Sequence, residues 1–212
     1  MAVLETPRAA CDMKRMTSLP PLRARPDVSE FLLTRRSRPA KTLTGPAPDR
    51  AALEPILIAA LRVPDHGKLE PWRLVVLSGA ALGRLADLTA RMGAARDLDP
   101  GKVAKAEAMF RDAPLMVAVV AAPQPSEKVP EIEQTLSAGA VCLGLLNAAQ
   151  AAGWGANWLT GWMATDRDWL AEGLSLAPAD WVAGFIVIGT ETVAPPDRPR
   201  PDPARLTEWR DA

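Results

Sequence analysis

The chain has 212 residues, of which 48% are hydrophobic and 24% are charged, with 25 basic and 25 acidic side chains. This composition is typical of a folded globular chain and excludes a disordered one. The longest apolar runs fall short of the roughly 18 residues that span a bilayer, and the zero net charge gives no reason to expect nucleic acid or an anionic membrane as a partner.

Residues 1–26 contain prolines and scattered charge without a sustained period, so we expect an N-terminal extension that is mobile or lies on the surface. Residues 27–212 are expected to form a single domain. The two cysteines, Cys11 and Cys142, fall in this extension and in an expected buried helix, which argues against a disulfide framework. We see no signal-peptide pattern and expect a cytoplasmic protein.

The first part of the domain alternates between helical and strand patterns. A helix begins near Asp27 and ends before Pro39, and a second helix carries Pro55 in its first turns or at a kink. Two prolines and a glycine then predict a loop. In chain order, the expected elements of this first part are helices over residues 27–35 and 49–62, a loop over 64–71, a strand over 72–78, helices over 79–95 and 100–112, and a buried strand over 114–122.

The second part begins with a helix over residues 130–153 that is apolar nearly all round after Ser137, which predicts burial. Its small residues should allow close approach of another backbone; they are Ser137, Ala138, Gly139, Ala140 and Gly144. Residues 154–162 read as a strand in which Trp154, Trp158 and Trp162 share one face. A short helix over 166–172, a buried strand over 181–190 and a proline-rich tail with a helical turn complete an α/β or α+β chain.

Several kinds of chemistry have no support in the sequence. One histidine and the lack of a CxxC pair argue against a metal site, so we expect no bound metal. No GxGxxG follows a strand, no GxxxxGK[ST] is present, and no GxSxG offers a serine nucleophile. We therefore assign no acid, base or nucleophile as a catalytic residue.

Anion binding is the chemistry that remains. Arg35, Arg36 and Ser37 end a helix and offer two guanidinium groups and a hydroxyl, which suit a phosphate. The same arginines could instead complement the helix dipole and stay solvated. Arg62 allows the same two interpretations, and His66, the single histidine, could be a turn residue or a functional one.

Taken together, these motifs resemble the FMN-dependent nitroreductase family. The helix leading into Arg35-Arg36-Ser37 is followed by VPDHGKLEPW, which is similar to the A-P-D-H…Q-P-W pattern of a compact subgroup. The likeness continues through QTLSAGAVCLGLLNAAQAAGWGANWLTG and WVAGFIVIGT, and so covers about residues 28–192. It implies an α+β sandwich with a mainly antiparallel central sheet flanked by helices. It also implies a homodimer with exchanged termini and FMN at the subunit interface.

The resemblance also implies which residues contact FMN. The phosphate and ribityl group would be held by Arg35 and Ser37, with Arg36 adjacent. The residues implied to contact the remaining parts of the cofactor are Arg62 and His66 in the loop, Trp158, Leu159 and Thr160 along the isoalloxazine, and Gly189 with Arg198 or Arg200 near the phosphate.

Two positions depart from the family. Pro39 occupies a position where many members carry a lysine near the flavin, so Arg36, Lys41 or Lys68 takes that role or no residue does. Leu159 replaces an arginine that is common in the subgroup.

The activity implied by the resemblance is that of an FMN-dependent NAD(P)H oxidoreductase that reduces nitroaromatic, quinone or similar electrophilic small molecules by a ping-pong mechanism. The alternative is a flavin-binding sensor or carrier without efficient reductase turnover. A third interpretation is a structural or interaction domain whose arginines are only solvated.

Overall fold

The computed structural model describes residues 21–211, and a division between two compact units falls between Thr34 and Arg35. The predicted extension, residues 1–26, lies largely outside the described residues. The first unit contains α1 (Pro26–Thr34), which starts at a proline, a residue that fits the first turn of a helix. Val28, Leu32 and Leu33 of α1 are exposed.

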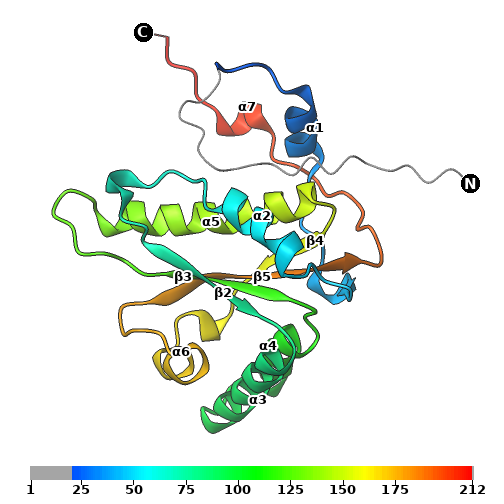
Figure 1. Cartoon of the computed structure of the whole chain (residues 1–212), viewed down its shortest axis with the longest axis vertical. Coiled ribbons are helices and arrows are strands. Elements are labelled where there is room, and N and C mark those ends of the chain that lie inside the picture. The colour runs from blue at the N-terminus through cyan, green and yellow to red at the C-terminus, as the bar shows by residue number, and fades with distance from the viewer. Residues whose placement is uncertain (1–20, 212) are drawn as a thin grey trace, which may run out of the picture. The chain divides into compact units, whose positions relative to one another are not determined.

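The second unit is built on a five-stranded antiparallel sheet (Figure 1). Its long strand β5 (Trp181–Glu191) pairs with β1 (Leu43–Thr44), β3 (Met116–Ala121) and β4 (Gly155–Leu159), and β3 also pairs with β2 (Trp72–Leu77). All four pairings are antiparallel, which confirms the expected sheet and the α+β class.

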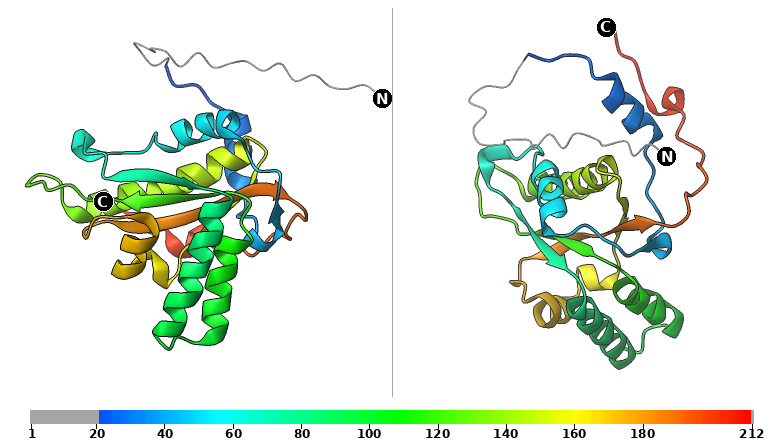
Figure 2. Two further views of the ribbon diagram at one scale, coloured as in Figure 1. Left: turned by 60° about the horizontal axis from the view of Figure 1, so that its bottom comes forward. Right: turned by 45° about the vertical axis from the view of Figure 1, so that its right-hand side comes forward.

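Helices cover both faces of this sheet (Figures 1 and 2). One face carries α2 (Arg50–Ala60) and α5 (Glu131–Ala151), and the other carries α3 (Ala80–Ala95), α4 (Pro100–Arg111) and α6 (Arg167–Leu174). Each face has its own hydrophobic cluster. Side chains along a strand point alternately to its two faces, so β3 contributes to both clusters. Met116, Ala118 and Val120 lie on the α3 side, and Val117, Val119 and Ala121 lie on the α5 side.

Aspartates fix the beginnings of three of these helices. The side chains of Asp49, Asp99 and Asp166 accept hydrogen bonds from backbone N–H groups of α2, α4 and α6 at 2.8, 2.9 and 2.9 Å. Each bond satisfies one of the N–H groups that a helix start leaves without a partner. The tail, beyond β5, contains the expected short helical turn, α7 (Pro203–Leu206).

The region after β4 differs from the sequence prediction. The strand ends at Leu159, and Trp162 begins a 3-10 turn, η3 (Trp162–Ala164). Trp154 consequently packs against the cluster on the α5 side, whereas Trp162 packs against the cluster on the α3 side. The expectation that Trp154, Trp158 and Trp162 share one face is therefore wrong, because the alternation of a strand does not continue through the turn.

The close approach predicted for the small residues of α5 occurs at Gly144. A Cβ atom added there would lie 2.9 Å from the carbonyl oxygen of Ala60 and 3.3 Å from its Cα. The last turn of α2 therefore rests directly on the backbone of α5.

We expect Gly144→Ala to lower the free energy of unfolding by about 1–3 kcal/mol, because the added methyl group overpacks a contact with backbone atoms. Gly83→Ala in α3 is the matched control, since its Cβ would have no neighbour within 4 Å. This control should be neutral or stabilising by up to about 1 kcal/mol, because alanine favours the helix over glycine. Urea denaturation of both variants measures the difference. Equal effects of the two substitutions would contradict the close packing of α2 on α5.

Candidate functional site

Four arginines gather near the ends of β1, β4 and β5, and we call Arg35, Arg36, Arg38 and Arg200 the arginine cluster. Arg35 Nη2 lies 3.5 Å from Ser37 Oγ, and Arg36 Nη1 donates to the carbonyl of Ser37 at 3.1 Å. Arg200 Nη2, from the tail after β5, donates to the carbonyl of Arg35 at 3.4 Å. The structure thus brings together Arg35, Arg36, Ser37 and Arg200, four residues that the sequence assigned to one site.

The arginine cluster carries more positive than negative charge. Arg38 pairs with Glu191 at 3.1 Å and Arg200 pairs with Asp197 at 2.9 Å, so two carboxylates face four guanidinium groups. Burial, and then the charges of Arg200 and Arg38, lower the pKa of Arg35 from its ordinary value. A nearby anion would relieve this repulsion.

Two donors of the arginine cluster are also left without acceptors. The Nε atoms of Arg35 and Arg36 are buried and have no hydrogen-bond partner. A buried N–H group without a partner costs free energy, and guanidinium N–H groups match the oxygens of a phosphate. The cluster is therefore suited to a phosphate or a similar oxyanion.

Two hydrogen bonds fix the arginine cluster beside β4. The N–H of Arg38 donates to the carbonyl of Ala156 at 2.9 Å, and the side-chain amide of Asn157 donates to the carbonyl of Arg38 at 2.6 Å. Trp158 and Leu159 end β4 and Thr160 follows it, and these three residues form the segment that the resemblance assigned to the cofactor. The cluster and this segment consequently belong to one part of the molecule.

A pocket of about 770 Å³ lies next to this segment, between α4, residues 40–41 and residues 158–163. Its apolar lining includes Ala40, Met109, Leu159, Trp162, Met163 and Val187. Its charged lining comprises Lys41, Lys102, Lys105 and Asp112. Lys102 and Lys105 were missed by the sequence analysis, because lysines on a charged helix give no signal that separates a pocket wall from a solvated face.

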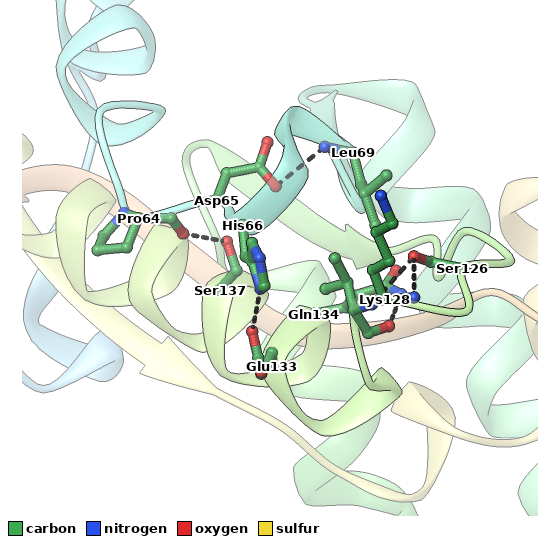
Figure 3. Close-up of polar contacts among 10 residues, drawn as sticks. Pro64, Asp65, His66, Leu69, Ser126, Lys128, Glu133, Gln134 and Ser137 are labelled. Atoms are coloured by element: carbon green, nitrogen blue, oxygen red, sulfur yellow. Dashed lines mark hydrogen bonds and ion pairs between the residues drawn. The ribbon is translucent and has the colours of Figure 1, made fainter.

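The predicted loop around His66 is a tight turn held against the start of α5 (Figure 3). His66 Nδ1 lies 2.8 Å from Glu133 Oε2, and Ser137 Oγ donates to the carbonyl of Pro64 at 2.7 Å. The carboxylate of Asp65 accepts from the backbone N–H groups of Leu69 and Glu70 at 3.2 and 3.0 Å. These bonds hold a turn in which Gly67, Lys68 and Glu70 have positive φ angles of 73°, 54° and 47°.

Ser137 joins this turn to the strand that follows it. Its hydroxyl accepts from Trp72 Nε1 at 3.0 Å while it donates to Pro64, so one buried side chain connects the turn, β2 and α5. His66 itself remains exposed, with 60% of its side-chain surface accessible. His66 therefore lies in a turn, as one of its two interpretations predicted, and its imidazole is accessible to a ligand.

The structure separates His66 from the arginine cluster, whereas Arg62 is exposed just after α2, whose last turn packs on Gly144 in the second half of α5. His66 contacts Glu133 in the first turn of α5, whereas the cluster contacts residues of β4, which follows the last turn of α5. At 1.5 Å per residue, the helix between these two points is roughly 27 Å long. Figure 1 shows the two regions at opposite ends of α5. One subunit therefore does not bring His66 and the arginine cluster together.

The remaining predicted positions are Gly189, Arg198 and Arg200. Gly189 is buried, and a Cβ atom there would meet Pro114 Cγ at 2.5 Å and the carbonyl of Thr44 at 2.8 Å. Gly189 is therefore surrounded by protein atoms of its own chain. Of the two arginines that the sequence left open, Arg200 is the one hydrogen-bonded to the cluster.

Other chemistries find little support in residues 21–211. Residues 21–211 contain no group of three or more His, Cys, Asp or Glu side chains that could hold a metal ion. Burial raises the pKa of the Cys142 thiol to about 12, so this buried thiol stays protonated and is a poor nucleophile at neutral pH. In the same part of the chain, no helix is long and apolar enough to cross a membrane.

Comparisons with known proteins show the family of the chain. Residues 32–190 match the sequence profile of the Nitroreductase family. The chain is 40% identical over 166 residues to a Haemophilus influenzae protein named "Putative NAD(P)H nitroreductase", an alignment that covers 77% of this chain and 88% of that protein.

Solved structures share the fold. A nitroreductase-like family protein from Bacillus cereus matches with a TM-score of 0.72 and 21% identity, covering 92% of this chain and 100% of that one. An FMN-dependent nitroreductase from Clostridium difficile matches with a TM-score of 0.62 and 17% identity, covering 85% and 98%. The nitroreductase-like α+β fold expected from the sequence is confirmed.

The anchoring of the His66 turn gives a prediction. Ser137→Ala removes the acceptor of Trp72 Nε1 and the donor to Pro64, so we expect a loss of about 1–3 kcal/mol in the free energy of unfolding. Glu133→Gln changes only the exposed pair with His66 and should cost less than about 1 kcal/mol. Chemical denaturation of both variants makes the comparison. A larger loss for Glu133→Gln would show that Ser137 is not the main anchor.

Proposed function

This chain belongs to the nitroreductase family, and we propose that it is an FMN-dependent NAD(P)H oxidoreductase that reduces nitroaromatic, quinone or similar electrophilic small molecules by a ping-pong mechanism. The observation that carries the proposal is the arginine cluster, with its excess charge and unpaired Nε–H groups, next to the residues that lead from β4 into the pocket. The names of the relatives support the choice of FMN and NAD(P)H.

The residues present fit the phosphate of FMN. Arg35 and Arg36 would use their free Nε–H groups, and Ser37 and Arg200 would complete the clamp. Burial, and then repulsion from Arg200 and Arg38, lowers the pKa of Arg35, and a phosphate there would stabilise its charged form. These contacts would anchor the cofactor without contributing to its redox chemistry.

Trp158, Leu159 and Thr160 would form the wall along which the isoalloxazine lies. Bound FMN would supply the hydride and electron chemistry, which is why no protein acid, base or nucleophile is required. The apolar side chains of the pocket would exclude water from the reacting atoms. The protein would thus contribute binding, orientation and shape.

Lys41 is the best candidate for the positive charge that Pro39 does not provide. It lines the pocket together with Trp158, Leu159 and Thr160. Arg36 is engaged with the carbonyl of Ser37, and Lys68 lies in the turn at the opposite end of α5. The ammonium group of Lys41 would stabilise negative charge that develops on a ligand in the pocket.

We also propose that the chain forms a homodimer with FMN at the subunit interface. Because one subunit separates His66 from the arginine cluster by most of the length of α5, a site that contains both needs residues of a second copy. A surface suited to that contact is present: Ile132, Leu136 and Leu143 of α5 are 62%, 66% and 46% exposed. Exposed apolar side chains on one helix are typical of an interface.

The absorbance spectrum of the purified protein tests the proposed function. We expect flavin bands that bleach when NADPH or NADH is added without oxygen and that return with a nitroaromatic acceptor. Bands that persist with either reductant would favour the sensor or carrier, which the departures at Pro39 and Leu159 motivate. A colourless protein that stays colourless with added FMN would refute flavin binding altogether.

The phosphate clamp is tested in the same preparation. Arg35→Ala should weaken FMN binding about 10- to 100-fold, because it removes charged hydrogen bonds to the phosphate. Arg50→Ala is the control, since Arg50 is an exposed arginine of α2 that forms no ion pair within the described residues. Fluorescence titration of FMN measures both constants. If Arg35→Ala and Arg50→Ala bind FMN with equal affinity, the arginine cluster is not part of the FMN site.

The dimer gives a separate prediction. Wild-type protein should sediment at twice the mass of one chain, and the double variant Leu136→Lys, Leu143→Lys should sediment as a monomer that has lost FMN affinity. Val76→Lys is the control, because Val76 is also 46% exposed but lies on β2 rather than on α5. Sedimentation velocity with circular dichroism separates dissociation from unfolding. A double variant that remains a folded dimer would place the interface elsewhere.

A further inference from the structure

The pocket beside α4 carries charges that the proposed cofactor contacts do not include. Lys102 and Lys105 are three residues apart on α4 and line the pocket together with Met109. Asp112, the one acidic residue in the lining, is at the other end of the helix, roughly 10 Å further along the axis from Lys105. The end of the pocket near the start of α4 is therefore the basic end.

The ammonium groups at that end are not neutralised by the protein. Among residues 21–211, neither Lys102 nor Lys105 forms an ion pair within 4.0 Å. The N-terminal turn of α4 adds partial positive charge, which the carboxylate of Asp99 offsets in part where it caps the N–H of Lys102. Positive charge at the edge of an apolar cavity attracts anions more strongly than the same charge on an open surface.

The rest of the pocket suits a small planar molecule. Its volume of about 770 Å³ lies within the range of ordinary small-molecule sites. Aromatic and aliphatic side chains, including Leu159, Trp162 and Met163, provide apolar walls. A ligand with an apolar ring and one anionic group would place the ring against these walls and the anion near the lysines.

We infer that the pocket receives the electron acceptor and favours acceptors that carry a carboxylate or another anionic group on a planar ring, with Lys102 and Lys105 as the residues that select them. The inference rests on the proposed function, because it takes the acceptor of that reaction as the ligand. It adds a substrate class that neither the fold nor the phosphate clamp specifies.

The test compares 4-nitrobenzoate with its neutral analogue 4-nitrobenzamide as acceptors for the holoenzyme. We expect a higher kcat/KM for 4-nitrobenzoate, arising from KM. The double variant Lys102→Gln, Lys105→Gln should reduce that preference roughly fivefold to tenfold, as expected from two solvent-accessible charge contacts. Asp112→Asn should raise the preference, because it removes the negative charge in the lining. High salt should reduce the preference of the wild type.

Lys128→Gln is the matched control, since Lys128 is an exposed lysine of the loop before α5 and does not line the pocket. It should leave the preference unchanged. Ligand-observed NMR titration of the same two compounds, without reductant, measures binding independently of turnover. It should show tighter binding of 4-nitrobenzoate to the wild type, and this difference should decrease in the double lysine variant.

The outcomes separate the two proposals. A protein without flavin or without turnover of either compound would refute the proposed function, whereas turnover of both with equal kcat/KM and equal binding would overturn only the inference. The inference would also fail if the lysine substitutions lowered FMN content while 4-nitrobenzoate did not bind to the holoenzyme. In that case the pocket would belong to the cofactor alone.

Discussion

The pairing of β5 with three other strands is the constraint on which the site depends. β5 is buried over most of its length, and its backbone hydrogen bonds hold β3 together with the short strands β1 and β4. Arg38 and Lys41 precede β1, the pocket wall begins at the end of β4, and Arg200 lies beyond the end of β5. Because one strand holds all three neighbours, the arginine cluster and the pocket share a single rigid support.

That support allows a charge arrangement that would be unfavourable on a mobile loop. Four guanidinium groups lie close together with only two carboxylates, and burial of Arg35 adds a desolvation cost. The Arg38–Glu191 pair and the hydrogen bond from Asn157 tie the segment to the sheet. The sheet thus stabilises an arrangement whose remaining repulsion would be relieved by a bound anion. The proposed phosphate site would therefore gain affinity at the expense of the stability of the empty protein.

The sequence predicted the parts of the fold that depend on local chemistry. Asp49 and Asp166 began the expected helices and are found as their N-caps, and the apolar run of β3 is buried on both faces as expected. The shared face of the tryptophans was predicted wrongly, because the end of β4 is set by a turn rather than by periodicity. The Ser37 region and Arg200 could be assigned to one site only through resemblance to a family, since 163 positions separate them in the sequence. Lys102 carried no local signal at all.

The single histidine lies far from the arginine cluster, and α5 connects the two regions. Glu133 accepts from Nδ1 of His66 when that nitrogen is protonated, which leaves Nε2 of a neutral imidazole as an acceptor. Ser137, one turn further along α5, fixes the backbone of the same turn through Pro64. α5 therefore orients the imidazole at one end and leads into β4 at the other. In the proposed dimer, two copies of α5 packed antiparallel would bring together the ends that one chain holds apart, so substitutions along α5 would affect cofactor binding without touching the arginine cluster.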